Sequence, residues 1–113
     1  MKNSIRVLLI LIASVFSSTS FSLELISNSI PEASVGNYMF KEIQLESMVS
    51  AIADVASQDG YKVSLDVSKP TGKKVIQVFA HKYPWPNIIE DIAYRNNLKL
   101  RLDKDAKHIY ITE

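Results

Sequence analysis

Apolar residues recur at intervals of three and four in two segments of the chain, and this spacing predicts two amphipathic helices. The first helix is expected within residues 45–60, with an apolar stripe made by Leu45, Met48, Val49, Ile52, Val55 and Ala56. Gly60 stands where a residue of left-handed conformation would end this helix. The stripe of the second helix is made by Ile88, Ile89, Ile92 and Ala93, and the pattern stops at Asn96 and Asn97.

Five shorter segments have the patterns of β-strands. Residues 61–67 alternate strictly, whereas residues 38–45 alternate less regularly, with Tyr38 and Phe40 on one face and Met39 and Ile43 on the other. Residues 75–80 are mostly apolar, which favours a more central strand. Two alternating segments complete the chain, and their buried residues are expected to be Leu98, Leu100, Leu102, Ile109 and Ile111.

The elements follow one another as strand, helix, strand, strand, helix, strand, strand. This order predicts an α+β fold, a small two-layer sandwich with two helices packed on short mixed sheets. Residues 23–37 contain Pro31 and Gly36 and have no sustained period, so we expect a leader that is partly mobile or docks irregularly. The ordered domain is then expected to cover residues 38–113.

The first 22 residues have the layout of a cleavable secretory signal. Lys2 and Arg6 precede an apolar run at 7–16, and Ser20 and Ser22 stand at the small-residue positions before a cut after residue 22. An uncleaved membrane anchor is the alternative, but the run is about half of the roughly 20 residues that span a bilayer. We therefore expect export to the periplasm, with a possible association of the mature protein with an outer-membrane complex.

Charge and composition narrow the classes of partner. Removal of Lys2 and Arg6 with the signal leaves 11 basic residues against 12 acidic ones, so the mature chain is close to neutral. A near-neutral exported domain gives no electrostatic reason to bind nucleic acid. The chain has no cysteine, so no disulfide stabilises it.

Enzyme chemistry has little support in the sequence. His81 and His108 are the only histidines, and no metal-binding, nucleophile or phosphate-loop motif occurs, so we expect no catalysis, metal or cofactor. The segment KPTGKK, residues 69–74, is interpreted as a hairpin turn. Glu90 and Asp91 are adjacent on the second helix and point about 100° apart, which disfavours a shared acid/base site.

Several turns and strands together resemble the short STN-like domain found at the N-terminus of outer-membrane secretins and of signalling TonB-dependent receptors. The matching pieces are Gln58 to Gly60, Gly72 to Val75, Pro84 and Trp85, Asn97 to Leu102, and Ile109 to Ile111. Secretins and receptors continue into further domains and a barrel, whereas this sequence stops at Glu113, so we expect a free-standing copy of the domain. The resemblance implies a free-standing accessory protein of a pilus or secretion system that binds protein and performs no chemistry.

The terminal strand pair offers a candidate interaction face. With residues 104–107 as the turn, Arg101 should face Tyr110, Asp103 should face His108, and Lys99 should face Thr112. We expect a cation–π contact in the first pair and a weak ion pair in the second. The alternative interpretation is an ordinary solvated sheet face. Exposed strand edges, or a leader that folds onto a partner, are two further candidates.

The segment HKYPWPNII, residues 81–89, links a strand to the second helix. Pro84 should end the strand and Pro86 suits the first helical turn. We expect Trp85 to cover the core, with its indole N–H bonded to a backbone carbonyl or water. Lys82 and Tyr83 lie just outside and are candidate contact residues.

The function predicted from these observations is a non-enzymatic periplasmic subunit that binds a secretin or a related component of a pilus or secretion apparatus. The alternative is a regulatory signalling module that binds an inner-membrane anti-sigma partner. Self-association is compatible with either role.

Overall fold

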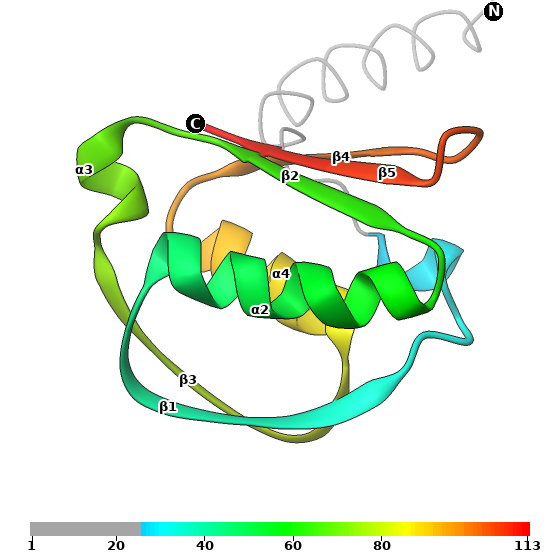
Figure 1. The fold of residues 1–113 in the computed structure, drawn as a ribbon, viewed down its shortest axis with the longest axis horizontal. Helices are drawn as coiled ribbons and strands as arrows, with labels where there is room; N and C mark the ends of the chain where they lie inside the picture. The colour runs from blue at the N-terminus through cyan, green and yellow to red at the C-terminus, as the bar shows by residue number, and fades with distance from the viewer. Residues whose placement is uncertain (1–25) are drawn as a thin grey trace, which may run out of the picture.

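A computed structural model of the chain describes residues 26–113, in which two helices lie between a three-stranded sheet and a two-stranded sheet (Figure 1). The predicted α+β class and the predicted order of the main elements are confirmed. The predicted signal, residues 1–22, lies outside the described residues. The elements are η2 (Ser27–Ser29), β1 (Val35–Gln44), α2 (Leu45–Gln58), β2 (Lys62–Asp66), α3 (Lys69–Gly72), β3 (Val75–Pro84), α4 (Trp85–Arg95), β4 (Lys99–Asp103) and β5 (His108–Thr112).

The two helices form where the apolar spacing predicts them. The predicted stripe of α2 is buried except for Val55, which is partly buried, and the stripe of α4 is buried throughout. Gly60 has a φ of 87°, the left-handed conformation expected beyond the end of α2. Asn97, after α4, is also left-handed, with a φ of 56°. The two helices contribute to one core shared by both sheets.

The three-stranded sheet has the order β2-β5-β4. β5 pairs antiparallel with β4 and parallel with β2, so the sheet is mixed. Each predicted inward residue of the last two strands is buried, at most 9% exposed. As the strict alternation of residues 61–67 predicts, the apolar side chains on one face of β2 are partly buried and pack against the core.

The two-stranded sheet, which we call the ribbon, pairs β1 antiparallel with β3 (Figure 1). The prediction that residues 75–80 form a more central strand is wrong, because β3 pairs with β1 alone and extends to Pro84. The face predicted for Ile43 is also wrong. A register shift lies between Phe40 and Ile43, and both side chains are partly buried against the core.

The connection between β2 and β3 is not the predicted hairpin turn, because the two strands belong to different sheets. The short helix α3 makes the crossing, and Ser68 caps it by accepting a hydrogen bond from the Thr71 N–H at 3.4 Å. Glu113 holds the same turn, since its carboxylate accepts hydrogen bonds from Thr71 Oγ1 at 2.6 Å and from Ser68. These bonds lower the pKa of Glu113, the Thr71 hydroxyl having the largest effect.

The described part of the leader is ordered against the domain. Ile26 and Ile30 are 0% and 6% exposed and belong to the common core. The Ser27 N–H donates to Glu90 on α4 at 2.7 Å. The boundary predicted at residue 38 is therefore too late, because β1 already begins at Val35. Burial of these isoleucines contradicts, for the described part of the leader, the candidate in which the leader folds onto a partner, and fits the expectation that it docks irregularly on the domain.

Trp85 is a core residue, at 0% exposure, and its indole N–H donates to Asp59 Oδ2 at 2.8 Å. The predicted burial is confirmed, but the hydrogen-bond acceptor is a carboxylate at the end of α2. The same carboxylate accepts from the backbone N–H and the hydroxyl of Ser34, each at 2.8 Å. These donors lower the pKa of Asp59, the Ser34 N–H first and the Trp85 indole second. Asp59 thus ties the leader, α2 and α4 together.

Candidate functional site

The outer face of the three-stranded sheet carries the first predicted contact surface. The ladder register of β4 and β5 is the predicted one, with Arg101 opposite Tyr110, Asp103 opposite His108 and Lys99 opposite Thr112. The predicted cation–π contact is confirmed, since Arg101 Cζ lies 4.3 Å from the centre of the Tyr110 ring. The ion pair predicted between Asp103 and His108 is wrong. Asp103 Oδ1 instead accepts from the Ala106 N–H in the turn, at 3.2 Å.

His108 has two other partners on this face. Its ring stacks on Tyr110, with centroids 4.1 Å apart and 14° between planes, and its Nε2 lies 2.5 Å from Ser64 Oγ on β2. Ser64 could not be found from the sequence, because the parallel pairing of β2 with β5 leaves no local pattern. We call the group of Ser64, Lys99, Arg101, His108 and Tyr110 the polar sheet face. Most of its polar groups are already paired with one another.

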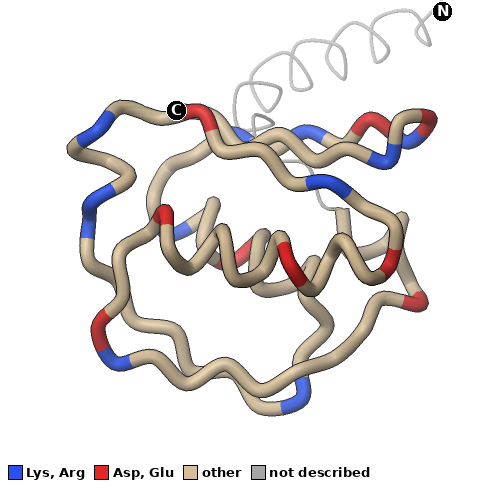
Figure 2. Tube along the Cα trace, viewed as in Figure 1, with Lys and Arg blue, Asp and Glu red and all other residues tan. Residues whose placement is uncertain are grey.

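Lys82 and Tyr83 lie on the ribbon, across the helix layer from the polar sheet face (Figures 1 and 2). Lys82 is exposed and left-handed, with a φ of 55°, and its N–H donates to Asn37 Oδ1 at 2.8 Å. This bond fixes the bend near the end of β3. The six residues predicted as contacts therefore form two separate surfaces, not one.

The ribbon exposes a set of large apolar side chains, each between 53% and 66% exposed: Val35, Met39, Val75, Phe79 and Tyr83. Met39 and Phe79 are directly opposite each other in the ladder. Figure 2 shows charged residues toward the ends of the ribbon and none along its middle. The sequence pattern places Met39 on the outward face but gives no sign that Phe79 lies opposite it, because their pairing joins segments 40 residues apart.

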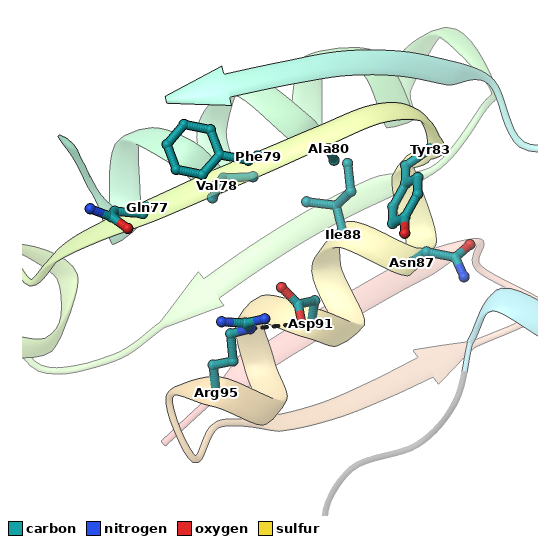
Figure 3. Close-up of a pocket in the computed structure, with 9 residues that line it drawn as sticks. All are labelled: Gln77, Val78, Phe79, Ala80, Tyr83, Asn87, Ile88, Asp91 and Arg95. Atoms are coloured by element: carbon teal, nitrogen blue, oxygen red, sulfur yellow. Dashed lines mark hydrogen bonds and ion pairs between the residues drawn. The ribbon is translucent and has the colours of Figure 1, made fainter. Parts of the chain in front are cut away.

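Beside the ribbon, a groove of about 500 Å³ separates β3 from α4 (Figure 3). We call it the ribbon groove. It is lined by Gln77, Val78, Phe79, Ala80, Tyr83, Asn87, Ile88, Asp91 and Arg95. A second hollow of about 250 Å³ shares three of these residues and continues to Ile92 and Asn96. The two hollows are therefore neighbours on the side of α4 that faces β3.

The groups able to do proton or metal chemistry are dispersed. Among residues 26–113, no three His, Asp or Glu side chains gather as metal ligands would. Glu90 and Asp91 have separate partners, Ser27 for the former and Arg95 Nε, at 2.9 Å, for the latter. The buried hydroxyl of Tyr38 has no hydrogen-bond partner in the described part of the chain, and burial raises its pKa.

No protein-family model matches the chain, and no curated protein matches its sequence. The resemblance to secretin and receptor domains stays a prediction from the sequence motifs. Within residues 26–113, no helix combines the length and apolarity needed to cross a membrane.

Proposed function

We propose that the mature chain is a non-enzymatic protein-binding subunit of the cell envelope that associates with a secretin or a related outer-membrane component. Its role is to assist assembly of a pilus or secretion apparatus. The secretory layout of residues 1–22 supports the compartment, and the motifs shared with secretin domains support the class of partner.

The observation that carries the protein-binding role is the exposed apolar surface of the ribbon. Apolar residues scattered singly over a surface need no explanation, but a contiguous apolar set is typical of an interaction site. Met39 and Phe79 form such a set across the two strands, with Tyr83 and the ribbon groove beside them. The polar sheet face is a weaker candidate, because four of its side chains already contact one another: Ser64, His108, Tyr110 and Arg101.

Capture from the native envelope tests the proposal. The tagged chain is expressed in its own cells, crosslinked, purified under denaturing conditions, and its partners are identified by mass spectrometry. We expect a secretin or another pilus or secretion component among the crosslinked proteins. Recovery of only an anti-sigma regulator, or of no envelope-machine component, would contradict the proposal.

Two matched double variants locate the surface. Met39→Ser with Phe79→Ser removes the exposed apolar pair on the ribbon, and we expect it to abolish capture. Arg101→Ala with Tyr110→Ala removes the cation–π pair on the other layer, and we expect capture to persist. Circular dichroism and thermal unfolding of each purified variant confirm that the fold is retained.

A further inference from the structure

We propose that the ribbon groove binds a short, extended, uncharged segment of the partner protein, which pairs with the free edge of β3 as a third strand of the ribbon. This inference names the contact made in the protein-binding role proposed above and rests on that role.

The edge of β3 that faces away from β1 is free. Within residues 26–113, the backbone of residues 76–81 makes hydrogen bonds only in the ladder with β1. Alternate N–H and C=O groups of an edge strand point away from its neighbour and are available to another chain. β3 carries no charged residue from Val75 to Ala80, so this part of its edge lacks the charges that commonly prevent strand addition, and Lys82 stands beyond it at the bend.

The groove has the shape that a single extended strand requires. Its floor is apolar and closed, since Val78, Ala80 and Ile88 are at most 8% exposed. Residues 76–83 of an extended strand rise by about 23 Å, and residues 87–96 of a helix rise by about 14 Å. A bound segment of about four to seven residues would therefore lie between β3 and α4 along their shared length.

The wall of the groove opposite β3 favours a single segment of another protein over a second copy of this chain. α4 lines the groove opposite β3, through Asn87, Asp91 and Arg95 (Figure 3). A second copy could offer its own β3, but that strand carries β1 on its other edge, at a spacing of about 4.8 Å. The paired strand would meet α4. A single segment from a different protein avoids this clash.

The charges of the lining indicate an uncharged occupant. Asp91 and Arg95 are the only acidic and basic residues that line the groove, and they neutralise each other in an ion pair at 2.9 Å. Gln77 and Asn87 add neutral polar groups. A segment with apolar side chains at alternate positions would place these on the floor and keep its backbone on the edge of β3.

A titration followed by NMR tests this inference. The probe is a blocked peptide of alternating threonine and valine, Thr-Val-Thr-Val-Thr-Val-Thr, added to ¹⁵N-labelled chain from residue 23 onward. We expect resonance shifts and slowed amide exchange at residues 76–83 and shifts at residues 87–95. Shifts confined to the free edge of β1 or to the polar sheet face, or no shifts at all, would overturn the inference.

A variant that fills the groove provides a second test of this inference. Asn87 is exposed on the helical wall, so Asn87→Trp fills the groove without entering the core. We expect it to weaken peptide binding by at least about tenfold, which corresponds to 1.4 kcal/mol. Ser50→Trp, at an exposed position of α2 outside the groove, is the matched control and should leave binding unchanged. Equal binding by both variants would refute the groove as the site.

The same variants separate this inference from the proposed function. Capture of a secretin component by the unmodified chain and equally by Asn87→Trp would overturn the groove and leave the proposed function standing. Failure of both to capture any envelope-machine component would contradict the proposed function itself. A dimer in sedimentation that Asn87→Trp converts to monomer would identify a second copy as the occupant and overturn the proposal of a segment from a different protein.

Discussion

Replacement of Asp59 by asparagine should loosen the joint that holds the leader, α2 and α4 together. The carboxylate accepts three hydrogen bonds at 2.8 Å, two from Ser34 and one from the indole of Trp85. Asparagine offers a single acceptor oxygen and no charge. At least one donor is then left without its partner, and the indole N–H belongs to a residue with 0% exposure.

The size of the effect follows from these contacts. A buried donor left unpaired costs about 1–3 kcal/mol, and Asp59 itself is partly exposed, so we expect Asp59→Asn to lose about 2 kcal/mol of unfolding free energy. In a domain of this size, that loss lowers the melting temperature by roughly 10 °C. The matched control is Asp54→Asn on the same helix, where the side chain is exposed and makes no hydrogen bond to any of residues 26–113.

The assay uses the single tryptophan of the chain, Trp85, whose fluorescence reports both the local hydrogen bond and global unfolding. The folded-state pKa of Asp59 is lowered, so its stabilisation is complete above the unfolded-state pKa of about 3.9 and is lost as pH falls through the lower folded-state value. The difference between wild type and Asp59→Asn should therefore shrink below about pH 4. Equal stability of the two proteins at pH 7, or a difference that grows in acid, would refute this account of the joint.

Three further predictions concern single residues. Tyr38→Phe should leave the free energy of unfolding in urea unchanged or raise it by up to about 1 kcal/mol, because the buried hydroxyl that it removes has no hydrogen-bond partner in residues 26–113. A clear loss of stability would show that the hydroxyl does make a hydrogen bond. Gly60→Ala should cost about 1 kcal/mol from backbone strain alone, since in residues 26–113 no atom beyond the chain neighbours lies within 4 Å of the added Cβ. An unchanged midpoint would contradict the left-handed conformation. Arg101→Ala should lower the free energy of unfolding by at most about 1 kcal/mol, because it removes the contact with Tyr110. The control Lys99→Ala should leave the free energy of unfolding unchanged. A larger loss for Arg101→Ala would mean that the polar sheet face has a structural role.

Local patterns in the sequence were sufficient to predict the two main helices and the five strands, but not the short helices η2 and α3 or the pairing of strands far apart in the chain. The register of β4 with β5 is predictable because a short turn joins adjacent strands and alternation fixes their faces. The parallel pairing of β2 with β5 and the pairing of β1 with β3 join segments far apart in the chain. No period within either segment encodes such a partner.

The same limit explains what was missed at the candidate site. Tyr83 is exposed and lines the groove, as its position outside the helix indicates, but the sequence gives no reason to place Asp91 and Arg95 in the same lining. Ile43 changes face because of a register shift, which alternation alone does not predict. The acceptor for the Trp85 indole, Asp59, lies 26 residues away and becomes visible only when α2 and α4 are packed together.

Position-specific photo-crosslinking in the native envelope tests the central claim most directly. A photoreactive residue is placed at Met39, exposed on the ribbon, or at Tyr94, which is 72% exposed on α4 but outside the groove lining. We expect a crosslink from position 39 to a secretin or another pilus or secretion component, and none from position 94. Crosslinking to that component from a probe at Tyr110 on the polar sheet face, with none from position 39, would contradict it.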